Sequence, residues 1–197
     1  MTGKIGGMAS HVALLRGINV GGRNKVPMAE LREVAASLGH TGVSTYIQSG
    51  NVLFCTPETD TARLASALGE AVSEAFGVAV SVVVLSRAQL ARILDSNPYP
   101  DEPKPQYVHV VFLGAEPPPD LLDRIKAAEN DAAAKGSRDT VTAVGEALFV
   151  HTPDGYGTSE LAEALFRIIG PPGKAGITAT ARNWATSTKL LSLCEQK

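Results

Sequence analysis

One stretch near the N-terminus combines residue types that can bind an anion. It holds three cations with no acidic residue among them, and its glycines let backbone N–H groups approach a phosphate near a helix start. The candidate ligand-binding residues are Arg16, Gly17, Asn19, Gly21, Gly22, Arg23, Asn24 and Lys25. Their spacing matches neither a Walker A loop nor the dinucleotide fingerprint. The alternative is a solvated turn in which the glycines serve backbone geometry alone.

A second basic stretch, residues 174–189, also lacks acidic residues and contains three further candidates, Arg182, Asn183 and Trp184. An arginine can grip a phosphate while a tryptophan stacks on a base. The alternative is that Trp184 anchors a helix by packing and that Arg182 is a solvated or capping group. We expect the two basic stretches to lie close together and to form one positive, partly aromatic surface.

The other reactive side chains indicate neither a metal site nor covalent catalysis. The histidines are His11, His40, His109 and His151, and no two of them have the spacing of metal ligands. His151 and Asp154 can form an acid–base pair, although His-x-x-Asp in a turn rich in proline and glycine is more often ordinary loop chemistry. We expect no metal and no cofactor, and the sequence leaves open whether the protein is an enzyme.

The composition excludes several classes of protein. The chain has 197 residues, 44% of them hydrophobic, and a formal charge of -2, which argues against a surface that binds polyanions everywhere. Cys55 and Cys194 fit reduced thiols in the cytoplasm. No run of about 18 apolar residues suggests a membrane span. Residues 1–8 are expected to be a disordered extension rather than a signal peptide, and the protein is expected to be soluble and cytoplasmic.

Hydrophobic periodicity predicts the elements that position these residues. The first half reads as a strand over 11–15, a helix from Pro27 to Gly39, strands over 43–48 and 52–55, a helix over 60–76 and a strand over 78–85. This order, β-α-β-β-α-β, is the split βαβ or ferredoxin-like arrangement. On its hairpin, Tyr46 and Gln48 share one face and suggest a groove, whereas Ser49 and Asn51 are typical turn residues.

The second half repeats this order through five elements. They are a strand over 107–113, a helix over 120–129, strands over 140–144 and 147–150 and a helix over 159–169. We therefore predict an α+β fold of two ferredoxin-like halves with antiparallel sheets and a C-terminal helix. The halves are expected at 9–85 and 107–170, with a helix and proline-rich connector over 86–106 and a C-terminal segment over 171–197.

Four motifs resemble the bacterial domain-of-unknown-function 1697 family. They are Leu-Leu-Arg-Gly-Ile-Asn-Val-Gly-Gly at 14–22, Lys-Val-Pro-Met at 25–28, Tyr-Ile-Gln-Ser-Gly-Asn-Val-Leu-Phe at 46–54 and Thr-Ala-Arg-Asn-Trp at 180–184. The resemblance implies two ferredoxin-like halves. It implies no activity and carries over no catalytic residue.

Our functional hypothesis is a binding module for a phosphate-bearing ligand, either a nucleotide or single-stranded nucleic acid. One alternative is an enzyme acting on a small anionic metabolite in a cleft between the two halves. A structural or partner-binding role is another alternative. The two basic stretches favour an anionic ligand over a purely structural role. They do not separate a binding module from an enzyme.

Overall fold

The structure, a computed structural model, describes residues 8–22, 24–170 and 177–196. The expected extension over 1–8 lies outside the described residues except for Met8. The strands are β1 (His11–Arg16), β2 (Thr41–Tyr46), β3 (Asn51–Cys55), β4 (Ser81–Ser86), β5 (Val108–Leu113), β6 (Thr140–Val144), β7 (Ala147–His151) and β8 (Ala179–Asn183). The helices are α1 (Met28–Ser37), α2 (Thr61–Phe76), α3 (Arg87–Asp95), α4 (Pro119–Ala134), α5 (Glu160–Ile169) and α6 (Trp184–Glu195), with short 3-10 turns at Pro105–Tyr107 and Tyr156–Thr158.

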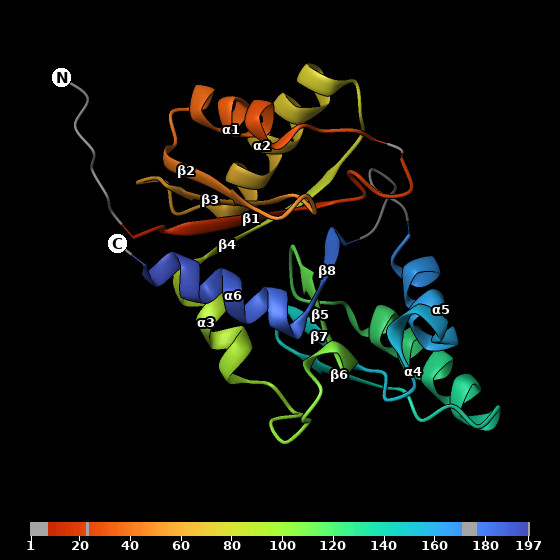
Figure 1. Cartoon of the computed structure of the whole chain (residues 1–197). Helices are drawn as coiled ribbons and strands as arrows, with labels where there is room; N and C mark the ends of the chain where they lie inside the picture. Colours follow the sequence, from red (N-terminus) through yellow and green to blue (C-terminus); the bar gives the residue numbers. More distant parts are fainter. Residues whose placement is uncertain (1–7, 23, 171–176, 197) are drawn as a thin grey trace. The chain divides into compact units, whose positions relative to one another are not determined.

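The chain divides into two compact units, each with its own sheet (Figure 1). Unit 1 takes the described residues up to Ala91 and from Lys189 onward, and unit 2 takes those between. The strand order is β2-β3-β1-β4 in unit 1 and β6-β7-β5-β8 in unit 2, with every neighbouring pair antiparallel. The predicted α+β fold with two antiparallel sheets and a C-terminal helix is confirmed.

The core of unit 1 lies between its sheet and the helices α1 and α2, which cover one face (Figure 1). Side chains alternate along a strand, so Ala13 and Leu15 of β1 point to the same face. They pack in one cluster with the inward residues of the helices, Leu31, Ala35, Leu64, Leu68 and Val72. The carboxylate of Asp60 caps α2 by accepting from the N–H groups of Ala62 and Arg63.

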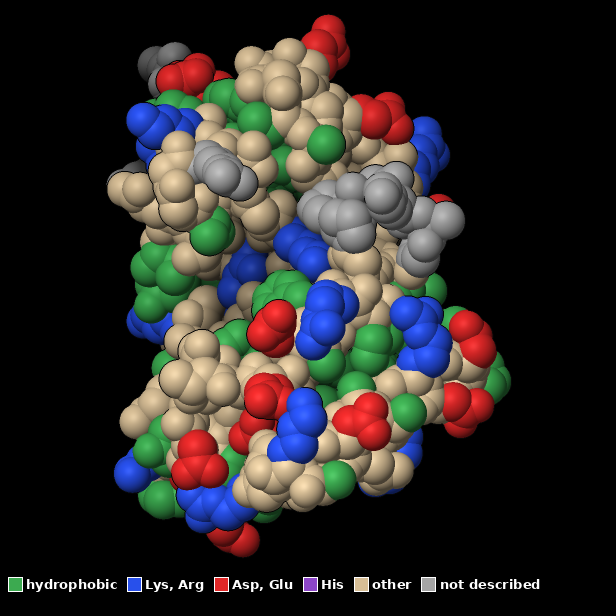
Figure 2. Space-filling view, turned by 90° about the vertical axis from the view of Figure 1, so that its right-hand side faces the viewer, with side chains coloured by type: hydrophobic (Ala, Val, Ile, Leu, Met, Phe, Trp, Pro, Cys, Tyr) green, Lys and Arg blue, Asp and Glu red, His purple; other side chains and the backbone are tan. Residues whose placement is uncertain are grey.

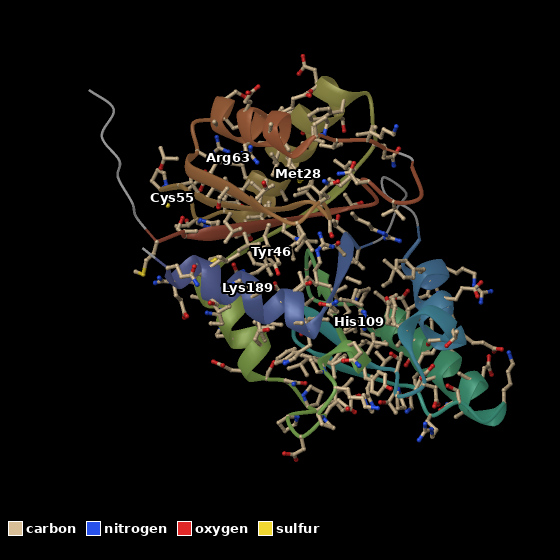
Figure 3. All side chains as sticks on the ribbon, viewed as in Figure 1. Met28, Tyr46, Cys55, Arg63, His109 and Lys189 are labelled. Carbon is tan, nitrogen blue, oxygen red and sulfur yellow. The ribbon has the colours of Figure 1, made fainter. Side chains whose placement is uncertain are left out.

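Unit 2 repeats this arrangement with α4 and α5 against its sheet, and a strand absent from the sequence prediction completes it. β8 pairs with the central strand β5, with Val110 opposite Arg182. The segment Ala-Thr-Ala-Arg-Asn is short and only weakly apolar, so its pattern gave no strand signal. On β5, His109 stacks on Tyr156 with ring centroids 3.7 Å apart, and burial lowers the pKa of His109 to about 4 (Figure 3).

Two buried histidines stack on Phe54 at one end of the unit 1 core. The ring centroids of His11 and His40 lie 5.7 Å and 4.3 Å from that of Phe54. Burial disfavours the charged imidazolium and lowers the pKa of both histidines, and the neighbouring His40 lowers that of His11 further. His40 Nε2 is buried without a hydrogen-bond partner in the described part of the chain. Burial therefore favours the neutral form of both rings.

This arrangement predicts that stability falls on mild acidification. An unfolded histidine takes up a proton near pH 6.5, whereas the folded rings resist it, so the free energy of unfolding decreases as the pH falls below about 6.5. We expect His40→Leu, which removes a buried polar atom without a partner, to reduce this decrease while remaining stable at pH 7.5. Urea unfolding of both proteins between pH 7.5 and 5.5 measures the effect. Parallel pH profiles for wild type and variant would contradict the role assigned to His40.

Candidate functional site

The candidate anion site falls on the β1–α1 loop, residues 17–27, which is the orange loop at the right of unit 1 in Figure 1. Its described residues with a left-handed backbone are Gly17, Asn19, Gly21, Gly22 and Asn24, with φ of 77°, 55°, 58°, 75° and 49°. Glycine and asparagine are the residues that adopt this region most readily. The residue types therefore match the turns of the loop, while Arg23 lies outside the described residues.

Asn19 holds the loop in shape through its side-chain amide. Nδ2 donates to the carbonyl of Val26 at 2.9 Å, and Oδ1 accepts from the N–H of Val26 at 2.9 Å. Nδ2 also donates to the carbonyl of Gln48 at 3.0 Å, in the turn between β2 and β3. Asn24 Nδ2 donates to the carbonyl of Gly17 at 2.9 Å. Both predicted ligand-binding asparagines thus have structural partners within the loop or beside it.

The remaining candidates of this loop are placed at its surface. Gly21, Gly22 and Lys25 are exposed, and Arg16 is partly buried at the end of β1. Lys25 lies two residues before Pro27, the N-cap of α1, which has no side-chain acceptor for the first-turn N–H groups. The first turn of α1 contains one acidic residue, Glu30. The loop therefore enters α1 with one described cation, Lys25, two residues before the N-cap, and with one acid, Glu30, in the first helical turn.

The turn of residues 47–50 packs directly against this loop, which the sequence did not predict. The N–H of Leu15 donates to the carbonyl of Gly50 at 2.8 Å. A Cβ on Gly50 would lie 2.8 Å from side-chain atoms of Leu15 and Ile18, so only a glycine permits this approach. We call the two segments, residues 17–27 and 47–50, the paired loops. They bring together three of the sequence motifs, those at 14–22, 25–28 and 46–54.

The polar residues of the hairpin divide into buried and exposed groups. Asn51 is fully buried and donates from Nδ2 to the carbonyl of Tyr46 at 3.0 Å, which is a structural role in the turn. Tyr46 is partly buried at the end of β2 (Figure 3), and Gln48 and Ser49 are exposed. The turn also exposes Ile47, a β-branched residue with φ 49°. Such a backbone costs about 1–2 kcal/mol for an L-residue.

The three candidates of the second basic stretch, Arg182, Asn183 and Trp184, belong to unit 2 and have structural partners there. Arg182 is 9% exposed, donates to Thr180 Oγ1 and to the carbonyl of Ala181 at 2.8 Å each, and has its pKa lowered to about 10 by burial. It is therefore not a solvated cation. Asn183 Oδ1 accepts from the N–H of Thr186 and caps α6, while Trp184 lies beside Phe149 with ring centroids 6.5 Å apart. That the two stretches adjoin stays a prediction.

In the structure, His151 pairs with Glu102 and not with Asp154, the partner considered from the sequence. Asp154 forms an ion pair with Arg138, and His151 Nε2 lies 2.6 Å from Glu102 Oε2. Tyr99 stacks on His151 at 4.9 Å. The hydrogen bond from His151 is the largest of the causes that lower the pKa of Glu102. The pair fastens the proline-rich connector to β7, and the sequence carried no sign of it because Glu102 and His151 are far apart along the chain.

Charges on α4 and α5 are mixed rather than concentrated. Figure 2 views the side of the molecule on which these helices lie in Figure 1, and it shows basic and acidic side chains interspersed there. Lys126 Nζ pairs with Glu129 at 2.6 Å, and Lys135 Nζ pairs with Glu160 at 2.7 Å. These cations are balanced locally. They give matched controls for the cations of the paired loops.

The described residues offer neither a metal-binding cluster nor a membrane-spanning helix. Residues 8–22, 24–170 and 177–196 contain no group of three or more His, Cys, Asp or Glu side chains arranged to hold a metal ion. Within the same ranges, every helix is too short or too polar to cross a lipid bilayer.

Comparison with known proteins identifies the family. The model of the family described as "Protein of unknown function (DUF1697)" matches residues 8–149. The chain therefore belongs to this family, and the resemblance seen in the motifs is confirmed. Among curated proteins, none matches. The solved structure of the conserved bacterial protein SP0830 from Streptococcus pneumoniae superposes with a TM-score of 0.67 at 24% identity, covering 94% of this chain and 98% of that chain, which supports the fold.

The contact of the paired loops predicts the effect of a methyl group at Gly50. Gly50→Ala combines a left-handed φ of 77° with a clash against Leu15 and Ile18, so we expect a loss of about 2–4 kcal/mol of stability. Gly77→Ala is the control, because Gly77 has φ 65° and no atom within 4 Å of the added Cβ. We expect it to cost about 1 kcal/mol. Equal losses in chemical denaturation would contradict the contact.

Proposed function

We propose that this protein binds a phosphate-bearing ligand at the β1–α1 loop, in the cytoplasm. The observation that carries the proposal is the exposed entry to α1, where Lys25 adjoins helix N–H groups that the N-cap Pro27 leaves without a side-chain acceptor. The positive end of a helix dipole and a nearby cation both attract an anion. The space around Gly21 and Gly22 is open, since a Cβ added at either would have no atom within 4 Å.

The distribution of charge supports an anionic ligand. Residues 11–29 and 40–57, which contain the paired loops and their strands, include no aspartate or glutamate. The same residues include Arg16, Arg23 and Lys25. On a protein with a formal charge of -2, the acidic residues are therefore concentrated elsewhere in the sequence. A local positive field of this kind raises the concentration of anions at the loop.

The loop residues favour binding over catalysis. Between Gly17 and Pro27 the chain offers amides, aliphatic side chains and cations, but no carboxylate, imidazole, thiol or hydroxyl group. General acid–base catalysis usually relies on groups of those kinds. Arg182, Asn183 and Trp184 remain part of the proposal as a second basic stretch, although each has a structural role in unit 2. Cys55 and Cys194, both thiols, fit the reducing cytoplasm.

The test measures anion binding by calorimetry with inorganic phosphate and with nucleotides. We expect Lys25→Gln to weaken binding about tenfold, because a hydrogen bond to a charged group contributes roughly 1.5–3 kcal/mol. Lys126→Gln is the matched control, since it removes the same charge from an exposed position on α4. We expect it to leave binding unchanged. Equal affinity in wild type and Lys25→Gln, or equal losses in both variants, would overturn the proposal.

A further inference from the structure

The paired loops, which contain the exposed cation Lys25, also expose two apolar side chains. Val20 of the β1–α1 loop is 67% exposed, and Ile47 of the β2–β3 turn is 48% exposed. The hydrogen bond from Asn19 to the Gln48 carbonyl, at 3.0 Å, joins the two segments that carry them. The close packing of Gly50 on Leu15 and Ile18 fixes the turn in this place. The segments that carry Val20, Lys25 and Ile47 are therefore held next to each other, since Asn19 bonds both Val26 and Gln48.

Ile47 carries two separate disadvantages at one position. Its φ of 49° is left-handed, which disfavours a β-branched residue, and almost half of its apolar side chain faces solvent. Asparagine or glycine would satisfy the turn without either disadvantage. Strained residues cluster where a ligand or partner uses them. The fold alone does not account for an isoleucine at position 47, whereas a ligand that packs on its side chain does.

We infer that the phosphate-bearing ligand is a nucleoside phosphate, whose base packs on Ile47 while its phosphate lies at Lys25 and the start of α1. This inference rests on the proposed function and adds the class of ligand. A planar base buries the aliphatic surface of Ile47, and its polar edge can meet the amide of Gln48, which is exposed in the same turn. An alkyl chain would bury the same surface but would form no hydrogen bond with that amide.

Calorimetry on the full chain with five probes tests this assignment. The probes are inorganic phosphate, ribose 5-phosphate, hexyl phosphate, adenosine monophosphate and a short single-stranded oligonucleotide. We expect adenosine monophosphate to bind at least fivefold more tightly than ribose 5-phosphate or hexyl phosphate. Affinity for the oligonucleotide well above that for adenosine monophosphate identifies single strands as the source of the nucleoside phosphate, and similar affinities identify the free nucleotide.

The variant Ile47→Asn separates the base contact from the phosphate contact. Asparagine accepts the left-handed backbone, so the variant keeps the turn. We expect it to weaken the binding of adenosine monophosphate about fivefold and to leave the affinity for ribose 5-phosphate unchanged. Phe166→Ser is the control, because Phe166 is 45% exposed on α5 of unit 2, and it should change neither affinity. Melting temperatures confirm that both variants are folded.

The outcomes that overturn this inference differ from those that overturn phosphate binding. If Lys25→Gln weakens every probe but Ile47→Asn weakens none, the phosphate site stands and the base contact is wrong. If hexyl phosphate binds as tightly as adenosine monophosphate, Ile47 accepts any apolar group and the assignment of a base is overturned. If the five probes bind equally to wild type and Lys25→Gln, the proposed function itself fails.

Discussion

The side-chain amide of Asn19 is the interaction on which the candidate site depends. Its three hydrogen bonds reach both backbone groups of Val26 and the carbonyl of Gln48. The eleven-residue loop between β1 and α1 would otherwise have many conformations, and ordering it without such bonds is costly in entropy. Asn19 closes the loop at its base and attaches it to the neighbouring turn. Ile18 and Val26, on either side, are then buried in the core.

This constraint explains why the loop can be exposed and still be positioned. Its two apolar ends lie in the core, with Ile18 and Val26 each 1% exposed, while its middle faces solvent. Gly50 completes the arrangement because a larger residue would push the hairpin turn away from Leu15 and Ile18. A binding surface made of two loops requires that both be held relative to each other. Here the side-chain amide of Asn19 bonds one loop to the other, and Gly50 lets them pack closely because it has no side chain.

The sequence predicted the repeated elements of the fold because their apolar periods are clear, as in α2 with Leu64, Leu68 and Val72. It did not predict β8, where Thr180 and Arg182 interrupt the apolar pattern and pairing with β5 supplies the stability. For the site, the glycines and cations indicated the β1–α1 loop, and its binding of an anion stays a prediction. The role of Asn19 and the approach of the hairpin turn depend on contacts between distant residues, which periodicity and composition do not contain.

The two units show that the scaffold alone does not create the site. In unit 2 the connection from β5 to α4 is the short segment Gly-Ala-Glu-Pro-Pro, with the acid Glu116 and no cation. The turn between β6 and β7 is Gly145-Glu146, again with an acid. Unit 1 has the same strand order, yet its corresponding loops are longer and free of acids. A shared core fixes where these loops emerge, and their residues decide the charge that they present. The cationic, acid-free character therefore belongs to the loops of unit 1, and unit 2 supplies a natural comparison with the same strand order and the opposite local charge.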